Sequence, residues 1–489
     1  MLVHQLIFGG EINSPALCQK NVKLNYGQLQ KKVGQYRDYL YAVGIRPQDR
    51  VALFAVNSME FIFSYMAIVS LGCVVVPLNT MLTPREISFI LKDAGVKHTV
   101  TDKQLLLSAG NDESPAVVQL YVPDIKKALE YANYSAAPEV SIEESGTCAI
   151  LYTSGTTGQP KGAMLSHNNL ISNVKSITQV IFTVGGDNFL CVLPMFHSFA
   201  WTCAVLAPLY AGASITIVET FSPKDVIATI RDQGVTVVLG VPAMFSYYAA
   251  LARPEDLAGV RVFASAAASL PMETINSFFA KTKQRVIEGY GLSEASPAVS
   301  FNPIEATKPG SVGLPLPGVQ VKIVDQEGRE IEPKQVGELI AQGANVMSGY
   351  FGLSGETAEA LRGGWLYTGD LAYKDEEGYI YIVDRKKDMV IVSGLNVYPR
   401  EVEEVLYQYP AVKEAAVIGV PDKKRGESVK AFVVLKEDMK LDKNDLKTFL
   451  RANLAAYKLP RDIVELASLP KNATGKVLKK ELRQLGKDK

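Results

Sequence analysis

A short segment at residues 152–162 combines hydroxyl, glycine and lysine side chains in the sequence Tyr-Thr-Ser-Gly-Thr-Thr-Gly-Gln-Pro-Lys-Gly. Its hydroxyl groups and backbone amides can donate hydrogen bonds, and Lys161 adds one positive charge, which together suit the many oxygens of a polyphosphate. The common P-loop places its lysine directly after a glycine, whereas here Gln159 and Pro160 separate Gly158 from Lys161. The segment therefore predicts a phosphate site with a different ATP chemistry.

The residues around this segment indicate which elements hold it. Cys148–Leu151 is a short apolar run of the kind that forms a buried strand. Ser166, a favoured N-cap residue, precedes a helix-like segment that begins at His167. A strand, a glycine-rich turn and a helix start would gather backbone N–H groups at one point. The alternative is a flexible surface loop, although such loops rarely carry this ordered mixture of residues beside a strand.

A second candidate site, at residues 289–294, reads Gly-Tyr-Gly-Leu-Ser-Glu. Gly289 and Gly291 flank Tyr290, so that backbone and ring can approach a flat ligand closely. Ser293 offers a hydroxyl group, and Glu294 offers a carboxylate that can hold Mg²⁺ beside phosphates. Taken alone, the pattern also fits an ordinary turn at the end of a strand.

Two further segments place one charged residue beside a turn glycine. Residues 365–370 read Trp-Leu-Tyr-Thr-Gly-Asp, and a carboxylate on such a turn can accept both hydroxyls of a ribose. Near the end of the chain, Lys476 follows Gly475 directly before the helix-like Val477–Arg483. On local grounds alone, Asp370 is more simply part of a turn and Lys476 one more lysine of a basic tail.

Length and composition are those of an ordinary globular protein. The 489 residues indicate two or three domains, and the formal net charge of zero gives no global attraction to nucleic acid or an anionic membrane. The five cysteines show no CxxC spacing, which predicts free thiols, mostly buried, in the cytoplasm. The first ten residues lack a basic region, so no signal peptide is expected. None of the four histidines has a zinc-like spacing to cysteine, so any metal is expected to be Mg²⁺ brought by a nucleotide.

Apolar runs alternate with amphipathic segments along the first 300 residues. Strands are predicted at Val51–Val56, Val74–Leu78, Val235–Gly240 and Val260–Ser265, and a helix at Pro84–Ala94. This alternation predicts an α/β fold with largely buried sheets.

Two uncharged stretches, at residues 61–83 and 188–218, are long enough for a membrane span, with His197 the only titratable group in the second. Glycines and prolines divide each into a helix and a strand, which favours a buried core over a span. The second stretch also suits the wall of an apolar substrate pocket.

The charge balance changes near residue 387. From Asp388 onward there are 20 basic and 15 acidic residues, so this part carries +5 and the rest −5. The charged run Asp384–Asp388 lies between two apolar segments, which predicts a linker rather than only a solvated turn. We expect an N-terminal domain at 1–386, a hinge at 384–388 and a C-terminal domain at 388–489.

The four segments, in this order, resemble the acyl-adenylate-forming (AMP-binding) enzymes, which include acyl-CoA synthetases, luciferases and peptide-synthetase adenylation domains. The resemblance extends from Asn21 to Arg483, and Tyr379–Leu406 is most similar to bacterial fatty-acid–CoA ligases. It implies a large multi-layer N-terminal domain with buried β-sheets flanked by helices, and a small mobile α+β C-terminal domain.

The resemblance also implies roles for individual residues. Those that would hold the β- and γ-phosphates of ATP are Thr153, Ser154, Gly155, Thr156, Thr157 and Lys161. Ser293 would touch the α-phosphate and Glu294 would ligate Mg²⁺. Tyr290 would stack on adenine, while Asp370 and Arg385 would bind the ribose.

Four more residues would serve the acid and CoA. His197 would border the acyl pocket, and Lys476 would reach across the cleft to the reacting carboxylate and α-phosphate. Lys387 would be the hinge about which the small domain rotates. This rotation would replace the Lys476 loop with the Gly394 region, and Gly394 would then line the path of the CoA pantetheine.

The expected reaction is ATP-dependent activation of a carboxylic acid to acyl-AMP, followed by transfer to CoA. The apolar residues Phe196, Phe199 and Trp201 favour a medium- or long-chain fatty acid, although each also fits an ordinary core. Where the family is commonly glycine-rich, this chain has Ser265–Ser269 with three alanines, whose methyl groups would narrow the pocket against a very long chain.

Three alternatives remain open. One is a CoA ligase for an aryl acid such as a cinnamate or succinylbenzoate, and another is an acyl-AMP ligase that loads a carrier protein. The third is a non-catalytic nucleotide-binding protein, which would be expected to have lost Lys161, Glu294 or Lys476. A fatty substrate would also bring transient contact with membranes, but no amphipathic anchor is evident.

Overall fold

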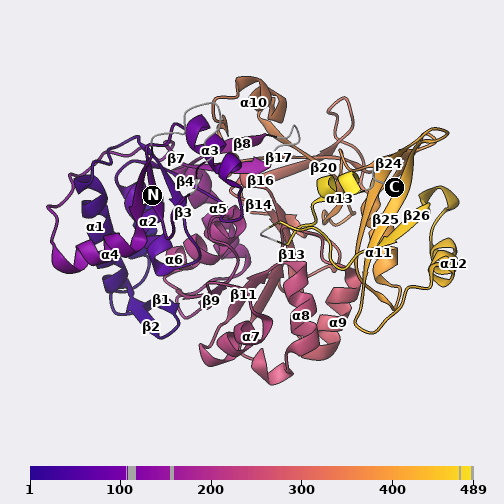
Figure 1. Cartoon of the computed structure of the whole chain (residues 1–489), viewed down its shortest axis with the longest axis horizontal. Helices are drawn as coiled ribbons and strands as arrows, with labels where there is room; N and C mark the ends of the chain where they lie inside the picture. The colour runs from indigo at the N-terminus through magenta and orange to yellow at the C-terminus, as the bar shows by residue number, and fades with distance from the viewer. Residues whose placement is uncertain (106, 108–116, 155–158, 473–474, 486–489) are drawn as a thin grey trace.

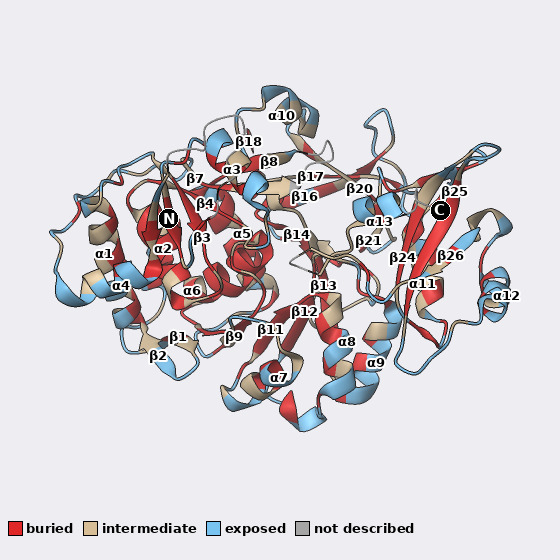
Figure 2. Cartoon of the chain, viewed as in Figure 1, coloured by how far each residue is buried: buried red, intermediate tan, exposed pale blue. Residues whose placement is uncertain are grey.

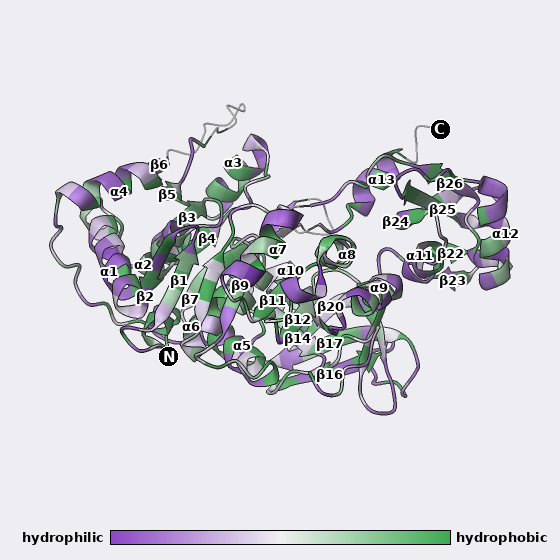
Figure 3. Cartoon of the chain, turned by 90° about the horizontal axis from the view of Figure 1, so that it is seen from below, coloured by the Kyte–Doolittle hydropathy of each residue, from purple (hydrophilic) through white to green (hydrophobic). Residues whose placement is uncertain are grey.

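The computed structural model describes residues 1–105, 107, 117–154, 159–472 and 475–485. A large body carries the N-terminus and a smaller lobe carries the C-terminal helix (Figure 1). Seen from below, the two parts are joined by a narrow waist (Figure 3). The described chain passes from the large body to the small lobe directly after strand β21 (Ile380–Arg385).

The largest sheet of the body has nine strands, parallel in its centre and antiparallel at both ends. Val-, Ile- and Phe-rich strands suit this position because parallel strands are buried on both faces. In spatial order the strands are β15 (Leu314–Pro315), β14 (Ala298–Phe301), β13 (Val286–Gly291), β12 (Val262–Ser265), β11 (Val237–Gly240), β9 (Asn188–Cys191), β10 (Ser214–Ile217), β1 (Pro15–Gln19) and β2 (Val22–Asn25).

A second sheet of the body has seven strands and contains an antiparallel hairpin, β7–β8, with β18 beside it at the edge. Its order is β18 (Gly349–Tyr350), β8 (Pro160–Ser166), β7 (Thr147–Ser154), β4 (Val74–Pro77), β3 (Arg50–Phe54), β5 (His98–Thr101) and β6 (Val118–Tyr121). The third, antiparallel sheet comprises β16 (Val319–Val324), β17 (Gly337–Gly343), β20 (Trp365–Lys374), β19 (Leu361–Arg362) and β21 (Ile380–Arg385).

Helices cover these sheets, and α5 packs against strands of two of them, β8 and β14. The body helices are α1 (Tyr26–Ala42), α2 (Met59–Ser70), α3 (Pro84–Asp93), α4 (Val122–Tyr131), α5 (His167–Val180), α6 (Ala207–Ala211), α7 (Pro223–Asp232), α8 (Pro242–Leu251), α9 (Met272–Thr282) and α10 (Ser354–Ala360). Shorter helical turns lie at Val3–Phe8, Ala200–Leu206, Pro254–Asp256, Ser293–Ala295 and Ala456–Lys458. Among the described residues, no helix is both long and apolar enough to cross a bilayer.

The small lobe is an α+β unit. Its sheet has the order β23 (Leu395–Val397), β22 (Val390–Val392), β25 (Gly426–Leu435) and β24 (Val412–Asp422), with β26 (Asp462–Glu465) beside β25. Helices α11 (Pro399–Tyr407), α12 (Lys443–Asn453) and α13 (Lys479–Leu485) complete it.

The buried residues form separate clusters in the two parts (Figure 2). The main cluster of the body runs from Val3 to Ile380, and the main cluster of the small lobe runs from Val390 to Ile463. Polar contacts also join the two parts. Arg400 of α11 donates from its backbone N–H to Asp384 at 2.9 Å, and Met272 donates its N–H to Glu404 at 3.4 Å.

The predicted α/β fold is confirmed, and the individual elements agree closely. The predicted strands correspond to β3, β4, β11 and β12, and the predicted helix to α3, with ends shifted by one or two residues. Ser166 caps α5, where its Oγ accepts the Asn169 N–H at 3.1 Å. The two uncharged stretches are buried core, as predicted, since α2 and the segment Ala200–Leu206 are buried on nearly all sides. Of the five free cysteines, four are buried and Cys18 is intermediate.

Candidate active site

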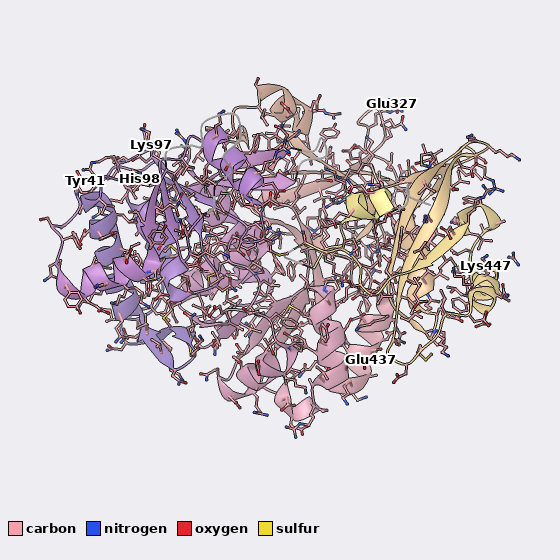
Figure 4. All side chains as sticks on the ribbon, viewed as in Figure 1. Tyr41, Lys97, His98, Glu327, Glu437 and Lys447 are labelled. Atoms are coloured by element: carbon pink, nitrogen blue, oxygen red, sulfur yellow. The ribbon has the colours of Figure 1, made fainter. Side chains whose placement is uncertain are left out.

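A cleft of ≈ 2340 Å³ lies between the body and the small lobe. It is lined by the ends of β7 and β13, the β20–β21 hairpin, helices α8 and α9, and the segment from Leu469 to Gln484. In Figure 4, Glu437 lies on the side of the small lobe near α9, whereas Lys447 of α12 lies on its outer face. The volume exceeds that of a typical single-ligand pocket, so the cleft has room for more than one substrate.

The described ends of the phosphate segment lie on two paired strands, β7 and β8. Thr153 and Lys161 are paired across the hairpin, and Ser154 pairs with Pro160. The three predicted phosphate ligands inside the turn, Gly155, Thr156 and Thr157, lie outside the described residues.

One prediction about this segment is wrong. The helix does not start at the turn, because residues 160–166 pair with β7 and form strand β8 before α5 begins. A seven-residue strand is roughly 20 Å long, so the N–H groups of α5 lie far from the turn. The hairpin backbone, rather than a helix N-terminus, therefore holds the turn.

Glu294 lies on a short helical turn directly after β13, facing the phosphate hairpin. Its Oε1 accepts a hydrogen bond from the Tyr350 hydroxyl at 3.0 Å and from Thr153 Oγ1 at 3.5 Å. The Nζ of Lys161 lies 5.4 Å from the centre of the Tyr350 ring. Residues 141 positions apart in sequence, Thr153 and Glu294, are thus brought together with Lys161.

Tyr290, Asp370 and Arg385 form a second group in the cleft. The Tyr290 hydroxyl donates to Asp370 Oδ2 at 2.6 Å, and Arg385 Nε lies 3.7 Å from Asp370 Oδ1. Asp370 and Arg385 are direct partners in the β20–β21 ladder. Burial and the neighbouring Asp370 hold the pKa of Tyr290 well above its usual value, so the phenol remains a donor. A Cβ at Gly369, where φ is +71°, would meet open space, which leaves room for a ligand beside Asp370.

The two glycines around Tyr290 are required mainly by the next strand. A Cβ on Gly289 would lie 2.3 Å from the Phe301 ring, and one on Gly291 would lie 2.0 Å from the Pro297 carbonyl oxygen. Both glycines line the cleft, but their lack of a side chain permits close packing against β14.

His197 lies at the inner end of the cleft, next to the pair Ser198 and Ser293, whose hydroxyls are 3.2 Å apart. Burial and the nearby Lys476 lower the pKa of His197 to about 4, so the ring is neutral at pH 7. Its Nδ1 accepts the Phe199 N–H at 3.2 Å, which places the remaining ring proton on Nε2. His197 is therefore a neutral hydrogen-bond donor.

Lys476 reaches the same cleft from the small lobe. Its backbone N–H donates to Asn472 Oδ1 at 2.9 Å, and Lys471 pairs with Val477 across the loop. Helix α13 starts at Lys479, two residues later than predicted. Removal from water and the nearby Arg385 lower the pKa of Lys476 to about 8, although Asp370 opposes this shift.

The structure brings most of the predicted site residues together, with Gly394 and Trp201 outside the cleft. Gly394 is exposed at the β22–β23 turn and does not line the cleft. For Trp201 the sequence left two readings open, an acid-facing side chain and ordinary core, and the structure favours the core, because its ring is buried against Tyr65 and Phe61 with ring centres 4.0 and 5.5 Å apart. The cause is that Trp201 lies on a helical segment whose side chains all point into the core.

The apolar part of the cleft contains Phe196 and Phe199, together with the three alanines Ala266–Ala268. Ala267 adopts φ +69°, a left-handed conformation that favours glycine. Tyr350 was not predicted from the sequence, because Gly-Tyr-Phe at 349–351 lies outside the four candidate segments.

Comparison with known proteins identifies the family. The sequence model described as AMP-binding enzyme matches residues 9–351, and that described as AMP-binding enzyme C-terminal domain matches residues 401–476. A long-chain-fatty-acid–CoA ligase of Bacillus subtilis is 35% identical over 94% of this chain and 90% of its own. A feruloyl-CoA synthase of an Amycolatopsis species is 36% identical over 96% of both chains.

A solved structure shares the fold over nearly the whole chain. The o-succinylbenzoate CoA synthetase of Bacillus subtilis, in complex with its acyl-adenylate intermediate, superposes with a TM-score of 0.87. It is 30% identical, and the match covers 98% of this chain and 97% of that one. The chain belongs to the AMP-binding enzyme family, and it is an AMP-forming acid–CoA ligase.

Proposed function

We propose that the protein converts a medium- or long-chain fatty acid, ATP and CoA into acyl-CoA, AMP and pyrophosphate through an acyl adenylate. The observation that carries this proposal is that Lys476, from the small lobe, lines the same cleft as His197 and the Asp370–Arg385 pair of the body. A cation at this point lies between an apolar pocket and a nucleotide-sized group of polar residues.

The described residues fit ATP and Mg²⁺. Lys161 and Thr153 would hold the terminal phosphates, with Ser154 and the turn residues Gly155, Thr156 and Thr157. Tyr290 would lie against adenine, Asp370 and Arg385 would bind the ribose, and Ser293 would touch the α-phosphate. The Glu294 carboxylate is a hard oxygen ligand suited to Mg²⁺, which would neutralise phosphate charge.

The first reaction step needs no base, since a carboxylate is already a nucleophile at neutral pH. The difficulty is that two anions must meet, and positioned positive charge reduces that repulsion. Lys476 would supply this charge to the carboxylate and α-phosphate. The neutral His197 would donate Nε2–H at the edge of the acyl pocket, where it orients the substrate without adding charge.

We further propose that the small lobe changes its orientation for the second step. The division would be a domain at 1–386, a hinge at 384–388 centred on Lys387, and a domain at 388–489. Separate hydrophobic clusters on the two sides and a polar contact surface support this division, because such interfaces can slide at low cost. Rotation would remove Lys476 and bring Gly394 to the path of the CoA pantetheine.

The apolar surface of Phe196, Phe199 and Ala266–Ala268 supports a fatty acid, as does the likeness to the Bacillus subtilis fatty-acid ligase. The same surface suits an aromatic ring, and relatives at similar identity are named for feruloyl and succinylbenzoyl substrates. An aryl acid is therefore the second candidate.

A panel of acids tests the proposal. Saturated fatty acids of graded length, ferulate, cinnamate and o-succinylbenzoate would each be supplied with ATP, Mg²⁺ and either CoA or a carrier protein. AMP, pyrophosphate and thioester would be measured separately. We expect the highest kcat/KM for a fatty acid with CoA. Preference for an aryl acid would replace the first candidate with the second, and thioester on the carrier alone would exclude the CoA reaction.

A further inference from the structure

Tyr350 contacts two charged groups on the phosphate side of the cleft, the carboxylate of Glu294 and the ammonium group of Lys161. It lies on the edge strand β18, half-buried, and faces the cleft. Its hydroxyl donates to Glu294 Oε1 at 3.0 Å, and its ring lies 5.4 Å from Lys161 Nζ.

The backbone around Tyr350 is fixed independently of this hydroxyl group. Met347 donates its N–H to the Glu294 carbonyl at 2.8 Å, and Phe351 donates to the Gly162 carbonyl at 2.8 Å. Asn345 Nδ2 donates to the Ala295 carbonyl at 2.9 Å. The segment 345–351 therefore joins the Glu294 turn to the β8 strand through two main-chain hydrogen bonds and the Asn345 amide. The phenol is therefore not needed to hold this backbone, and its hydroxyl group contacts one carboxylate oxygen of Glu294.

We propose that Tyr350 is a positioning residue that orients Glu294 toward Mg²⁺ and Lys161 toward the nucleotide phosphates. This inference rests on the proposed function, because it assigns Glu294 to the metal. A carboxylate held by one hydrogen bond keeps its other oxygen directed at a ligand, and such outer contacts typically change metal affinity 10–100-fold when removed. The ring face attracts the ammonium group of Lys161 without neutralising it, so the charge remains available to phosphate.

Two substitutions separate the two contacts. Tyr350→Phe removes the hydroxyl and retains the ring, whereas Tyr350→Leu removes both. Tyr379→Phe is a matched control, since the Tyr379 hydroxyl donates to the Ala306 carbonyl at 2.6 Å and Lys308 Nζ lies 4.4 Å from its ring. Tyr379 does not line the cleft, so its variant tests the loss of a similar contact elsewhere in the body.

The affinity for α,β-methylene-ATP, which cannot be cleaved at the α-phosphate, is measured by calorimetry over a range of Mg²⁺ concentrations. For Tyr350→Phe, the Mg²⁺ concentration at half-maximal nucleotide affinity should rise 10–100-fold, with affinity at saturating Mg²⁺ close to wild type. For Tyr350→Leu, affinity at saturating Mg²⁺ should also fall several-fold. Tyr379→Phe should match wild type in both respects.

A double-mutant cycle with Glu294→Gln distinguishes positioning from general destabilisation. Tyr350→Phe should have little further effect on Mg²⁺ dependence once the carboxylate is removed. The inference is overturned if Tyr350→Phe binds nucleotide with wild-type Mg²⁺ dependence, or if its effect is the same in the Glu294→Gln background. Failure of the wild-type protein to bind the nucleotide analogue would instead contradict the proposed function itself.

Discussion

The two halves of the cleft are built in different ways. On the body side, Asp370, Tyr290 and Glu294 lie in or directly beside strands, and each makes a hydrogen bond with another side chain of the body. On the small-lobe side, Lys476 lies on a loop that is held by its own backbone and by the Lys471–Glu414 pair at 2.7 Å. Under the proposed function, the nucleotide site made from sheets would be preformed, whereas the lysine would reach it only when the lobes are correctly oriented.

Removal of the Lys476 charge should have the largest effect. For Lys476→Ala we expect acid-dependent pyrophosphate release to fall by about 10²–10³-fold, the usual cost of losing one transition-state contact. Thioester formation from supplied acyl adenylate should remain, because the second step uses the other orientation. Lys447→Ala, on the outer face of α12, is the control (Figure 4). Unchanged pyrophosphate release would refute the role of Lys476.

A proline at the hinge should affect only one half-reaction. Lys387→Pro restricts the backbone at this position. The neighbouring backbone hydrogen bonds are donated by the amides of Lys386, Asp388 and Met389, so the substitution removes none of these donors. Adenylate formation should persist and thioester formation should fall about tenfold or more, measured as separate half-reactions. Lys387→Ala removes the same side chain with a free backbone and should retain both. An equal loss of both half-reactions would argue against a hinge at this position.

The pH dependence of adenylation should follow the protonation state of Lys476 rather than that of the groups on the body side of the cleft. Because the pKa of Lys476 is lowered to about 8, its ammonium form, which the first step needs, is lost as pH rises through this value in the free enzyme. We expect kcat/KM for adenylation to decline above about pH 8. Lys476→Arg retains its charge and should move this decline to higher pH. A wild-type profile that stays flat to pH 10 would contradict the assignment.

A smaller effect is expected at Glu288, which is buried where the two lobes meet. Burial raises its pKa to about 7, and Arg400 and Glu404 of α11 act on it with opposite signs. The folded state therefore binds more protons than the unfolded state between about pH 4.5 and 7, so stability falls as pH rises through this range.

For Glu288→Gln, the free energy of unfolding at pH 8 should exceed that of wild type by on the order of 2 kcal/mol, and the difference should shrink toward pH 5. The amide oxygen can still accept the Gly310 N–H that Glu288 accepts at 3.2 Å. Denaturant unfolding at several pH values measures this. The exposed Glu437→Gln is the control, and a difference that does not vary with pH would contradict the prediction.

Much of the body could be predicted from its sequence, because local patterns fix its elements. Apolar runs gave the strands β3, β4, β11 and β12, and Ser166 marked the start of α5. Strand β8 at 160–166 was not recognised, since its sequence Pro-Lys-Gly-Ala-Met-Leu-Ser contains proline and glycine and lacks the β-branched residues that are typical of strands. Which of Phe196, Phe199 and Trp201 line the cleft could not be decided from the sequence, because sequence spacing does not say which apolar residues face a cavity.

By itself, the sequence determined the types of chemical groups available and their order: a segment proposed to bind phosphate, a carboxylate proposed for Mg²⁺, an aspartate proposed for the ribose and a late lysine. Only the tertiary structure decided that Tyr350 lies between Lys161 and Glu294, and that His197 and Lys476, in separate lobes, share one cleft. The physical reason is that residue type sets charge and hydrogen-bonding capacity. Which of these groups meet depends on sheet pairing and lobe packing across hundreds of residues.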